Sequence, residues 1–207
     1  MTRPRFRRLP LAAVMLALLT AACASDRPMP VPPVAPGASP SAKASGKDTF
    51  DKATILDTSK RFFGGATEGL AKVVEKVFQD LGEPNAYIAG EEGSGALIVG
   101  ARYGGGFLYR KYQDPQRVYW RGPSVGFDGG GNASKVFVLI YNLELSTDIY
   151  TLYPGVEGSY YFVAGVGVNY QRKGQVVLAP IRTGVGLRAG INVGYLRYSR
   201  KRRWMPF

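Results

Sequence analysis

The clearest pattern of apolar and polar positions in the chain is helical and covers residues 66–84. Apolar side chains recur there at intervals of three and four residues, and charged or amide side chains fill most positions between them. The apolar positions are Leu70, Val73, Val74, Val77, Phe78 and Leu81. This spacing predicts one amphipathic α-helix whose apolar face packs on a core. Thr67 is placed to cap its start, and Gly82 with Pro84 marks its end.

After Pro84 short runs of β-branched and aromatic residues alternate with glycine. Connections such as "YQDPQR" and "YPGVEGS" are too short for parallel crossovers, so the strands should pair antiparallel. The predicted fold is mainly β (α+β): a small antiparallel β-barrel-like sheet of about eight to ten short strands with one N-terminal amphipathic helix packed on it. Residues 48–60 show no clear period and remain unassigned. The predicted strands cover residues 86–90, 96–103, 107–112, 118–121, 124–127, 135–143, 160–170, 175–178 and 183–198.

Glycine repeats on one face of the last predicted strand, which reads "TGVGLRAGINVGYLRYS". A similar alternation occurs in "VAGVGVNYQ", residues 163–171. Glycine repeated on one strand face indicates strong bending or a close neighbour. We favour packing against another element, with the acyl chain of a ligand as the alternative.

Residues 1–22 have the pattern of a signal peptide. Four arginines without an acid precede an apolar run that ends in small residues. The run is shorter than the roughly 20 residues that a membrane-spanning helix needs. We therefore expect export and removal of this segment.

Cys23 ends the sequence "LTAAC", which resembles the lipobox of bacterial lipoproteins, where cleavage leaves the cysteine as a lipid-bearing N-terminus. Thr20 departs from the leucine that is commonest three positions before the cysteine. Cleavage after Ala24 is the alternative and would release a soluble periplasmic protein. Residues 23–47 are then the lipidated cysteine and a Pro-rich flexible tether, which has too little apolar surface to fold alone. We expect residues 48–207 to form a single domain that is tethered in the periplasm to a membrane, with the outer membrane favoured.

The net charge of the chain limits the classes of partner that it is expected to bind. Removal of residues 1–22 takes away four arginines and no acid, which lowers the formal net charge from +12 to +8. A basic exported protein meets lipid head groups and anionic envelope polymers, whereas nucleic acid is in another compartment. We expect the membrane as one partner, phospholipid or another anionic envelope polymer as a second, and no nucleic acid.

The residue inventory excludes most catalytic chemistry. The chain contains no histidine and only one cysteine. Serine and cysteine nucleophiles need an imidazole as base, and zinc or copper sites need thiolate or imidazole. A single cysteine also excludes an internal disulfide. We therefore expect no cofactor, no metal and no enzymatic activity.

Four stretches together resemble the EipA-type family of Gram-negative cell-envelope proteins. They are "FFGGATEGLAKVVEKVF", "GPSVGFDGGGNASKVFVLIYNL", "YPGVEGSYYFVAGVGVNYQRKG" and "LAPIRTGVGLRAGINVGYLRYSRKRRWMPF". The resemblance runs from about Phe62 to Phe207 and implies a small periplasmic β-barrel domain that supports envelope integrity without a known reaction. Cys23 and the Pro-rich tether depart from the usual family member, which an ordinary signal peptide releases.

A fainter resemblance joins residues 126–142 to SYLF (Ysc84-like) domains. The matching feature is a glycine-rich turn before an apolar strand, in "GFDGGGNASKVFVLIYN". Because some SYLF domains bind phospholipid, this resemblance implies lipid binding. The turn itself is a glycine-rich loop of unknown role: Asp128, Gly129, Gly130, Gly131 and Asn132.

The C-terminal run "RYSRKRRW" combines cations with an aromatic residue, as membrane interfaces do. The simpler interpretation is a solvated basic tail that keeps the chain soluble. The candidate lipid or polyanion contacts are Arg197, Arg200, Lys201, Arg202, Arg203 and Trp204.

Two alternatives remain open. A wall-polymer hydrolase would need paired carboxylates, drawn from Glu91, Glu92, Asp128 and Glu157. We expect Glu91 and Glu92 to lie in a solvent-exposed turn instead. The second alternative is a small outer-membrane β-barrel, which the charges and proline before Phe207 disfavour.

Overall fold

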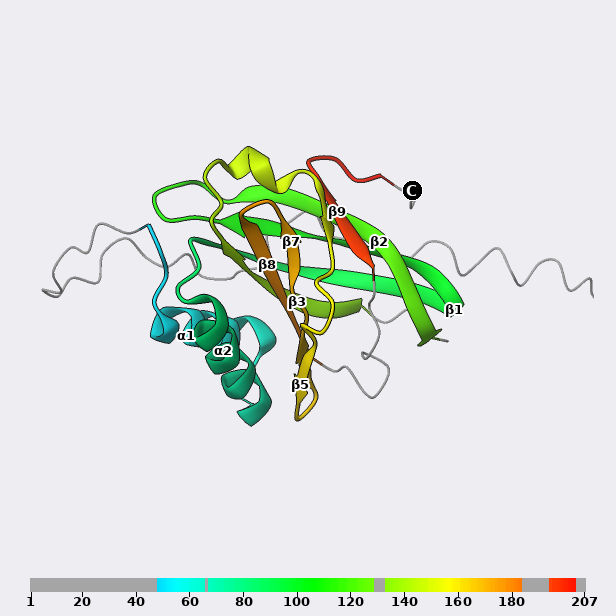
Figure 1. The fold of residues 1–207 in the computed structure, drawn as a ribbon, viewed down its shortest axis with the longest axis horizontal. Helices are drawn as coiled ribbons and strands as arrows, with labels where there is room; N and C mark the ends of the chain where they lie inside the picture. The colour runs from blue at the N-terminus through cyan, green and yellow to red at the C-terminus, as the bar shows by residue number, and fades with distance from the viewer. Residues whose placement is uncertain (1–47, 66, 129–132, 184–193, 204–207) are drawn as a thin grey trace, which may run out of the picture.

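The computed structural model describes residues 48–65, 67–128, 133–183 and 194–203. Two helices precede a mainly antiparallel β-sheet that curls into a barrel-like shape (Figure 1). The helices are α1 (Lys52–Phe63) and α2 (Glu68–Leu81), and η2 (Ser146–Ile149) is a short 3₁₀ helix. The strands are β1 (Ala86–Tyr109), β2 (Gln116–Asp128), β3 (Ala133–Tyr141), β4 (Leu152–Pro154), β5 (Tyr161–Val163), β6 (Val166–Val168), β7 (Gln171–Lys173), β8 (Val176–Thr183) and β9 (Tyr195–Ser199).

Helix α2 confirms the helical pattern and its caps. The side chain of Thr67 accepts a hydrogen bond from the backbone N–H of Leu70 at 3.2 Å, and Gly82 ends the helix with φ of 77°. The buried positions include Leu70, Val73 and Val77. Among the described residues, neither helix has the length and apolar character needed to cross a bilayer.

Helix α1 corrects the expectation of a single helix. Asp51 caps it by accepting from the backbone N–H of Thr54 at 2.9 Å. Its buried face consists of Ile55, Thr58, Ser59 and Phe62. Two of these four side chains are hydroxylic, so the buried stripe does not stand out as apolar in the sequence.

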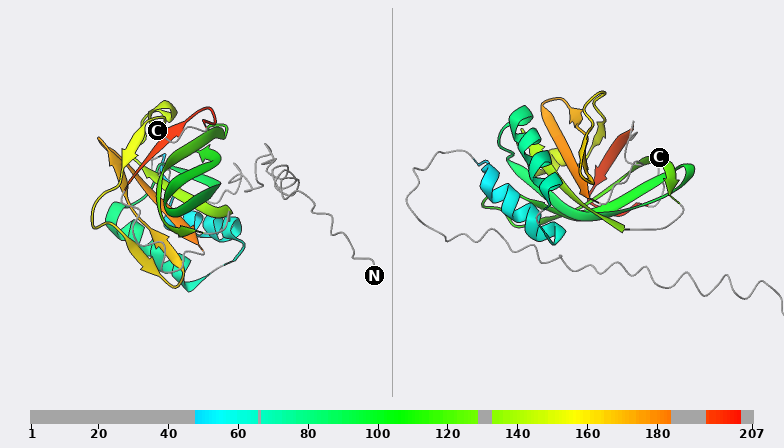
Figure 2. Two further views of the ribbon diagram at one scale, coloured as in Figure 1. Left: turned by 90° about the vertical axis from the view of Figure 1, so that its right-hand side faces the viewer. Right: turned by 90° about the horizontal axis from the view of Figure 1, so that it is seen from below.

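The strands form one sheet in the order β4-β9-β2-β1-β3-β8-β6-β5, with β7 also paired to β8. The long strand β1 doubles back on itself. Residues 86–93 pair with β3, whereas residues 96–108 pair with β2. The rings of Tyr87 and Tyr109 stack at 4.9 Å, so the two ends of β1 lie side by side. The curl of the sheet is visible in the left panel of Figure 2.

The two ends of the curl meet at a narrow seam. Gly155, just after β4, forms an isolated bridge with Gln171 at the start of β7. The backbone N–H of Val156 also donates to the carbonyl of Tyr170 at 2.8 Å. By comparison, β3 and β8 pair over six residues. The seam is therefore the thinnest connection described between neighbouring strands of the curl.

Side chains alternate between two cores on opposite faces of the sheet. One face of β3 presents Phe137 and Leu139 to a core shared with α1 and α2, which we call the helix face. The other presents Val138 and Ile140 to the inside of the curl, which we call the interior. The right panel of Figure 2 shows both helices on the same side of the sheet. Burial on both faces explains why β3 is apolar from Val136 to Tyr141.

Several predicted strand boundaries were wrong. The three strands predicted between residues 86 and 112 are continuous in β1, because Gly104 to Gly106 stay in the ladder with β2. The strand predicted over residues 160–170 is a hairpin, because Ala164 and Gly165 turn with positive φ. The glycine alternation of residues 184–193 lies outside the described residues.

Candidate functional site

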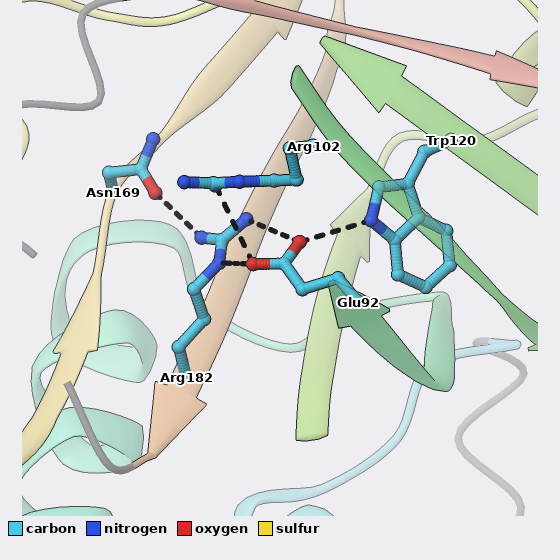
Figure 3. A network of polar contacts seen from close by, with 5 residues as sticks. All are labelled: Glu92, Arg102, Trp120, Asn169 and Arg182. Atoms are coloured by element: carbon cyan, nitrogen blue, oxygen red, sulfur yellow. Dashed lines mark hydrogen bonds and ion pairs between the residues drawn. The ribbon is translucent and has the colours of Figure 1, made fainter. Parts of the chain in front are cut away.

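The most unusual polar group in the fold is a buried carboxylate, Glu92 on β1. Its side chain points into the interior and has 6% exposure. Arg182 on β8, at 7% exposure, donates to it twice: Nε to Oε1 at 2.6 Å and Nη2 to Oε2 at 3.4 Å. Figure 3 shows this two-pronged contact. Buried ion pairs need such geometry to offset the loss of hydration.

Three further side chains complete the group. The indole Nε1 of Trp120 on β2 donates to Oε2 of Glu92 at 3.1 Å. Arg102, on the returning half of β1, lies with Nη1 3.6 Å from Oε1 of Glu92. Asn169 accepts from Nη1 of Arg182 at 3.0 Å. The group therefore ties β1, β2 and β8 together across the interior.

Burial and charge act in opposite directions on Glu92. Burial alone would raise the pKa of its carboxyl group. The positive charges of Arg182 and Arg102, together with hydrogen bonds from Arg182 and Trp120, outweigh burial and lower the pKa to about 2. Glu92 is therefore ionised at any physiological pH.

Tyr198 on β9 lies beside this group and adds an unused donor. Its ring packs 6.0 Å from the ring of Trp120, and the residue is 2% exposed. No hydrogen-bond partner for its hydroxyl is found among the described residues. Burial raises the pKa of Tyr198, and Arg182, Glu92 and Arg102 are close enough to influence it. We call Glu92, Arg102, Arg182 and Tyr198 the polar end of the interior.

Glycine makes room for the tryptophan that supports Glu92. A Cβ atom at Gly104 would lie 2.2 Å from Cε2 of Trp120. A Cβ atom at Gly90 would lie 2.8 Å from Cη2 of the same ring and 2.4 Å from the carbonyl oxygen of Gly105. These distances are shorter than any ordinary contact, so the indole occupies space that side chains would otherwise fill. Close packing therefore accounts for glycine at Gly90 and Gly104.

Three of the four candidate carboxylates, Glu91, Glu92 and Glu157, have described side chains, and their surroundings differ. Glu91 is exposed, and its neighbour Glu92 is buried because successive strand residues point to opposite faces. The expectation that both line an exposed turn is therefore wrong for Glu92. Glu157 lies exposed in the turn after β4. A general acid must hold a proton at working pH, which Glu92 does not.

The candidate basic contacts lie on another surface, at the β9 end of the sheet. All five described members are exposed: Arg197, Arg200, Lys201, Arg202 and Arg203. The guanidinium of Arg200 lies 4.9 Å from the ring centre of Tyr150, and that of Arg202 lies 5.6 Å from Tyr119. The guanidinium of Arg117 lies 5.1 Å from the ring centre of Tyr119 and 4.8 Å from that of Phe107. We call these cations and rings the basic surface.

Other predicted site residues are not described. Cys23 and the tether, Trp204, and Gly129 to Asn132 lie outside the described residues. Asp128 is the last residue of β2. The structure therefore leaves the lipidation and glycine-loop predictions as predictions.

Sequence reasoning missed the polar end of the interior. Arg182 lies within the apolar run "VVLAPIRT", and Arg102 follows "GALIVGA". The sequence did contain a signal for a buried ion pair: each of these apolar strands includes a lone cation. Glu92 also lies on the same strand face as Ile88 and Gly90, at every second position. Pairing these residues across 90 positions required the strand order, which the sequence does not reveal.

Comparison with known proteins identifies the family. The chain is similar to a crystal structure described as a beta-barrel-like, uncharacterized protein from Brucella abortus. The TM-score is 0.72 at 47% sequence identity, over 78% of this chain and 100% of that one. No curated protein sequence matches. A family profile described as "EipA: Envelope integrity protein A" matches residues 48–207, so the chain belongs to the EipA family of envelope integrity proteins.

Proposed function

We propose that this EipA-family protein is an exported, membrane-tethered and non-enzymatic domain that supports the cell envelope by binding an anionic envelope surface. The basic surface makes the contact, and phospholipid is the expected ligand. Lipid on Cys23 would keep the domain beside the bilayer, so that even weak contacts are occupied. Membership of the EipA family supports a role in the cell envelope, without specifying a ligand.

The pairing of cations carries this proposal. On the helix side, Lys52, Arg61, Lys72 and Lys76 each form a salt bridge with a carboxylate. Among the described residues, no carboxylate forms a salt bridge with Arg197, Arg200, Lys201 or Arg203. The charge of these four cations is therefore available to an external anion, at about 1 kcal/mol per Lys or Arg near an anionic bilayer.

The aromatic partners strengthen this interpretation. A guanidinium that already stacks on a ring, as Arg200 does on Tyr150, loses less side-chain freedom on binding. Rings beside cations also suit the interfacial region of a bilayer. In a freely solvated tail, the arginines would not lie against Tyr119 on β2 and Tyr150 just after η2.

The two alternatives are less consistent with the geometry. A hydrolase would need two accessible carboxylates at a working separation, and Glu92 is held between two arginines. A membrane-spanning barrel would present an apolar outside to lipid, whereas α1 and α2 cover one outer face of this sheet. Lipid binding by likeness to SYLF domains stays a prediction.

Co-sedimentation with vesicles tests the proposal. The test variant replaces Arg200, Lys201, Arg202 and Arg203 with Gln, and the matched control replaces the four paired helix cations with Gln. Both lose the same formal charge. We expect the test variant to bind phosphatidylglycerol vesicles at least tenfold more weakly, and the control to bind nearly as wild type does.

Each other result has a defined meaning. If both variants bind vesicles equally weakly, binding depends on net charge alone and the basic surface is not a specific site. Unchanged binding by the test variant, or equal binding to zwitterionic vesicles, would overturn the proposal. Preference for lipopolysaccharide over phosphatidylglycerol would keep the surface and change the ligand.

A further inference from the structure

We propose that two exposed aromatic side chains at the edge of the sheet bind a sugar ring of an envelope glycan. The side chains are those of Tyr160 and Phe162, and we call this pair the aromatic rim. Asn169 lies beside the pair and supplies a polar contact. The aromatic rim is separate from the basic surface, and its ligand is a saccharide rather than a charged bilayer.

The aromatic rim belongs to the edge strand β5, which is the last strand in the order of the sheet. Tyr161 and Val163 pack on the core of the helix face. Successive strand residues point to opposite faces, so Tyr160 and Phe162 point to the side of the sheet that faces the interior. At the edge, no further strand covers them among the described residues.

Both rings are open to solvent and lie parallel to each other. Tyr160 is 40% exposed and Phe162 is 39% exposed, and the ring planes differ by 8° with their centres 6.5 Å apart. A Cβ atom at Gly167 of β6 would lie 3.4 Å from Oη of Tyr160 and 3.6 Å from Cδ2 of Phe162. The two rings therefore rest across this glycine instead of projecting away from the sheet.

Polar groups lie next to these rings. Arg182 is the register partner of Gly167, and it is close enough to influence the pKa of Tyr160. The side-chain oxygen of Asn169 accepts from Nη1 of Arg182 at 3.0 Å, as Figure 3 shows. No hydrogen bond joins Nδ2 of Asn169 to another described residue. This half-buried amide therefore has a fixed orientation and a donor that a ligand can use.

This combination of groups fits a sugar better than a lipid. One face of a sugar ring presents C–H groups, which are attracted to the negative face of an aromatic ring. The rim of the sugar carries hydroxyl groups, which need donors and acceptors such as Nδ2 of Asn169 and the hydroxyl of Tyr160. An acyl chain would cover that amide and leave its donor unpaired, at a cost in free energy.

Isothermal titration calorimetry with tetra-N-acetylchitotetraose tests the site. We expect saturable binding by wild type, with a Kd on the order of 1 mM or tighter. Phe162→Ala should weaken binding at least about tenfold, and Phe162→Leu should weaken it nearly as much because leucine keeps the apolar surface without the aromatic face. Tyr112→Ala is the matched control, since this aromatic residue is 90% exposed outside the site, and it should bind as wild type does.

The polar contact has its own variant. Asn169→Asp keeps an oxygen for Arg182 and removes the Nδ2 donor, so binding should become roughly three- to tenfold weaker. Thermal unfolding checks that each variant is folded. Because Phe162 is exposed, its substitution should change the Tm little.

Two glycan sources are compared. Tighter binding of tetra-N-acetylchitotetraose than of the lipid-free polysaccharide from lipopolysaccharide indicates a cell-wall glycan, and the reverse order indicates lipopolysaccharide sugars. The Gln variant of Arg200, Lys201, Arg202 and Arg203 should bind either glycan as wild type does, which keeps this test independent of the basic surface.

Several results would overturn the proposal. They are the absence of saturable binding to both glycans, wild-type affinity in Phe162→Leu, and equal weakening by Tyr112→Ala and Phe162→Ala. Loss of vesicle binding in Phe162→Ala would assign the aromatic rim to the bilayer instead. Conversion of a dimer to a monomer in the same variant would assign it to a second copy of the chain.

Discussion

Two adjacent glutamates show how position on a strand decides what a carboxylate does. Glu91 is exposed, and Glu92 is enclosed by Arg182, Arg102 and Trp120. The residue types are identical, so the sequence alone gave them one interpretation, an exposed turn. The alternation of strand faces after Ile88 places Glu92 on the buried face and Glu91 on the exposed one. Only the strand order, however, shows that Arg182 lies beside Glu92.

We predict that Glu92→Gln destabilises the protein by about 3–5 kcal/mol, because two buried guanidinium groups lose their carboxylate. Glu91→Gln is the control and should change the free energy of unfolding by less than about 0.5 kcal/mol. Urea unfolding measures both. Similar values for the two variants would show that the buried pair contributes nothing specific.

The lowered pKa of Glu92 predicts loss of stability in acid. A carboxyl group whose pKa is about 2 in the folded protein, against an ordinary value of 4.5, stabilises the fold fully above pH 4.5. Its contribution of about 3 kcal/mol should decrease as the pH falls from 4.5 toward 2. Urea unfolding at several pH values measures this slope. Glu92→Gln should remove this part of the pH dependence, and an identical slope in the variant would contradict the assignment.

At the scale of elements, helix α2 was predictable and the strand boundaries were not. The stripe of Leu70, Val73 and Val77 and the caps at Thr67 and Gly82 act locally, so the sequence contains them. Helix α1 was missed because Thr58 and Ser59 share its buried face. The sequence predicted three separate strands between residues 86 and 112, and it did not reveal that they form one doubled-back strand or how each half of β1 pairs.

Glycine packing within β1 gives a prediction at this scale. A Cβ atom at Gly106 would lie 2.3 Å from the carbonyl oxygen of Ala89 and 2.7 Å from the Cα atom of Gly90. Backbone atoms cannot rotate away, so Gly106→Ala should destabilise by about 3 kcal/mol or more. Gly93→Ala, where a Cβ atom meets nothing within 4 Å, should be neutral or slightly stabilising. Thermal unfolding compares the two variants, and equal effects would contradict the close packing of the halves.

For the whole molecule, the sequence predicted the family, the β-rich class and the location of the basic run. It could not place the basic surface and the polar end relative to each other. The structure separates them: Arg200 is exposed beside Tyr150, whereas Arg182 is buried against Glu92. The basic surface and the polar end of the interior can therefore be mutated independently of each other.

The tether gives a prediction for the whole molecule. Cys23→Ala should move the protein from the membrane fraction to the soluble periplasmic fraction, because the lipid attachment point is lost while the A-x-A cleavage site remains. Cell fractionation and mass spectrometry of the mature N-terminus measure this outcome. A wild-type protein beginning at Ser25 would contradict lipidation, and a variant that stays bound after a carbonate wash would contradict tethering.

The seam between Gly155 and Gln171 has a mechanical consequence. A ring of strands opens first where fewest hydrogen bonds must break, so the curl is hinged rather than uniformly rigid. The amide proton of Val156 should exchange with solvent through brief local opening, while those of β3 should exchange only on global unfolding. Such opening would admit small solutes to the inside of the curl while the fold persists.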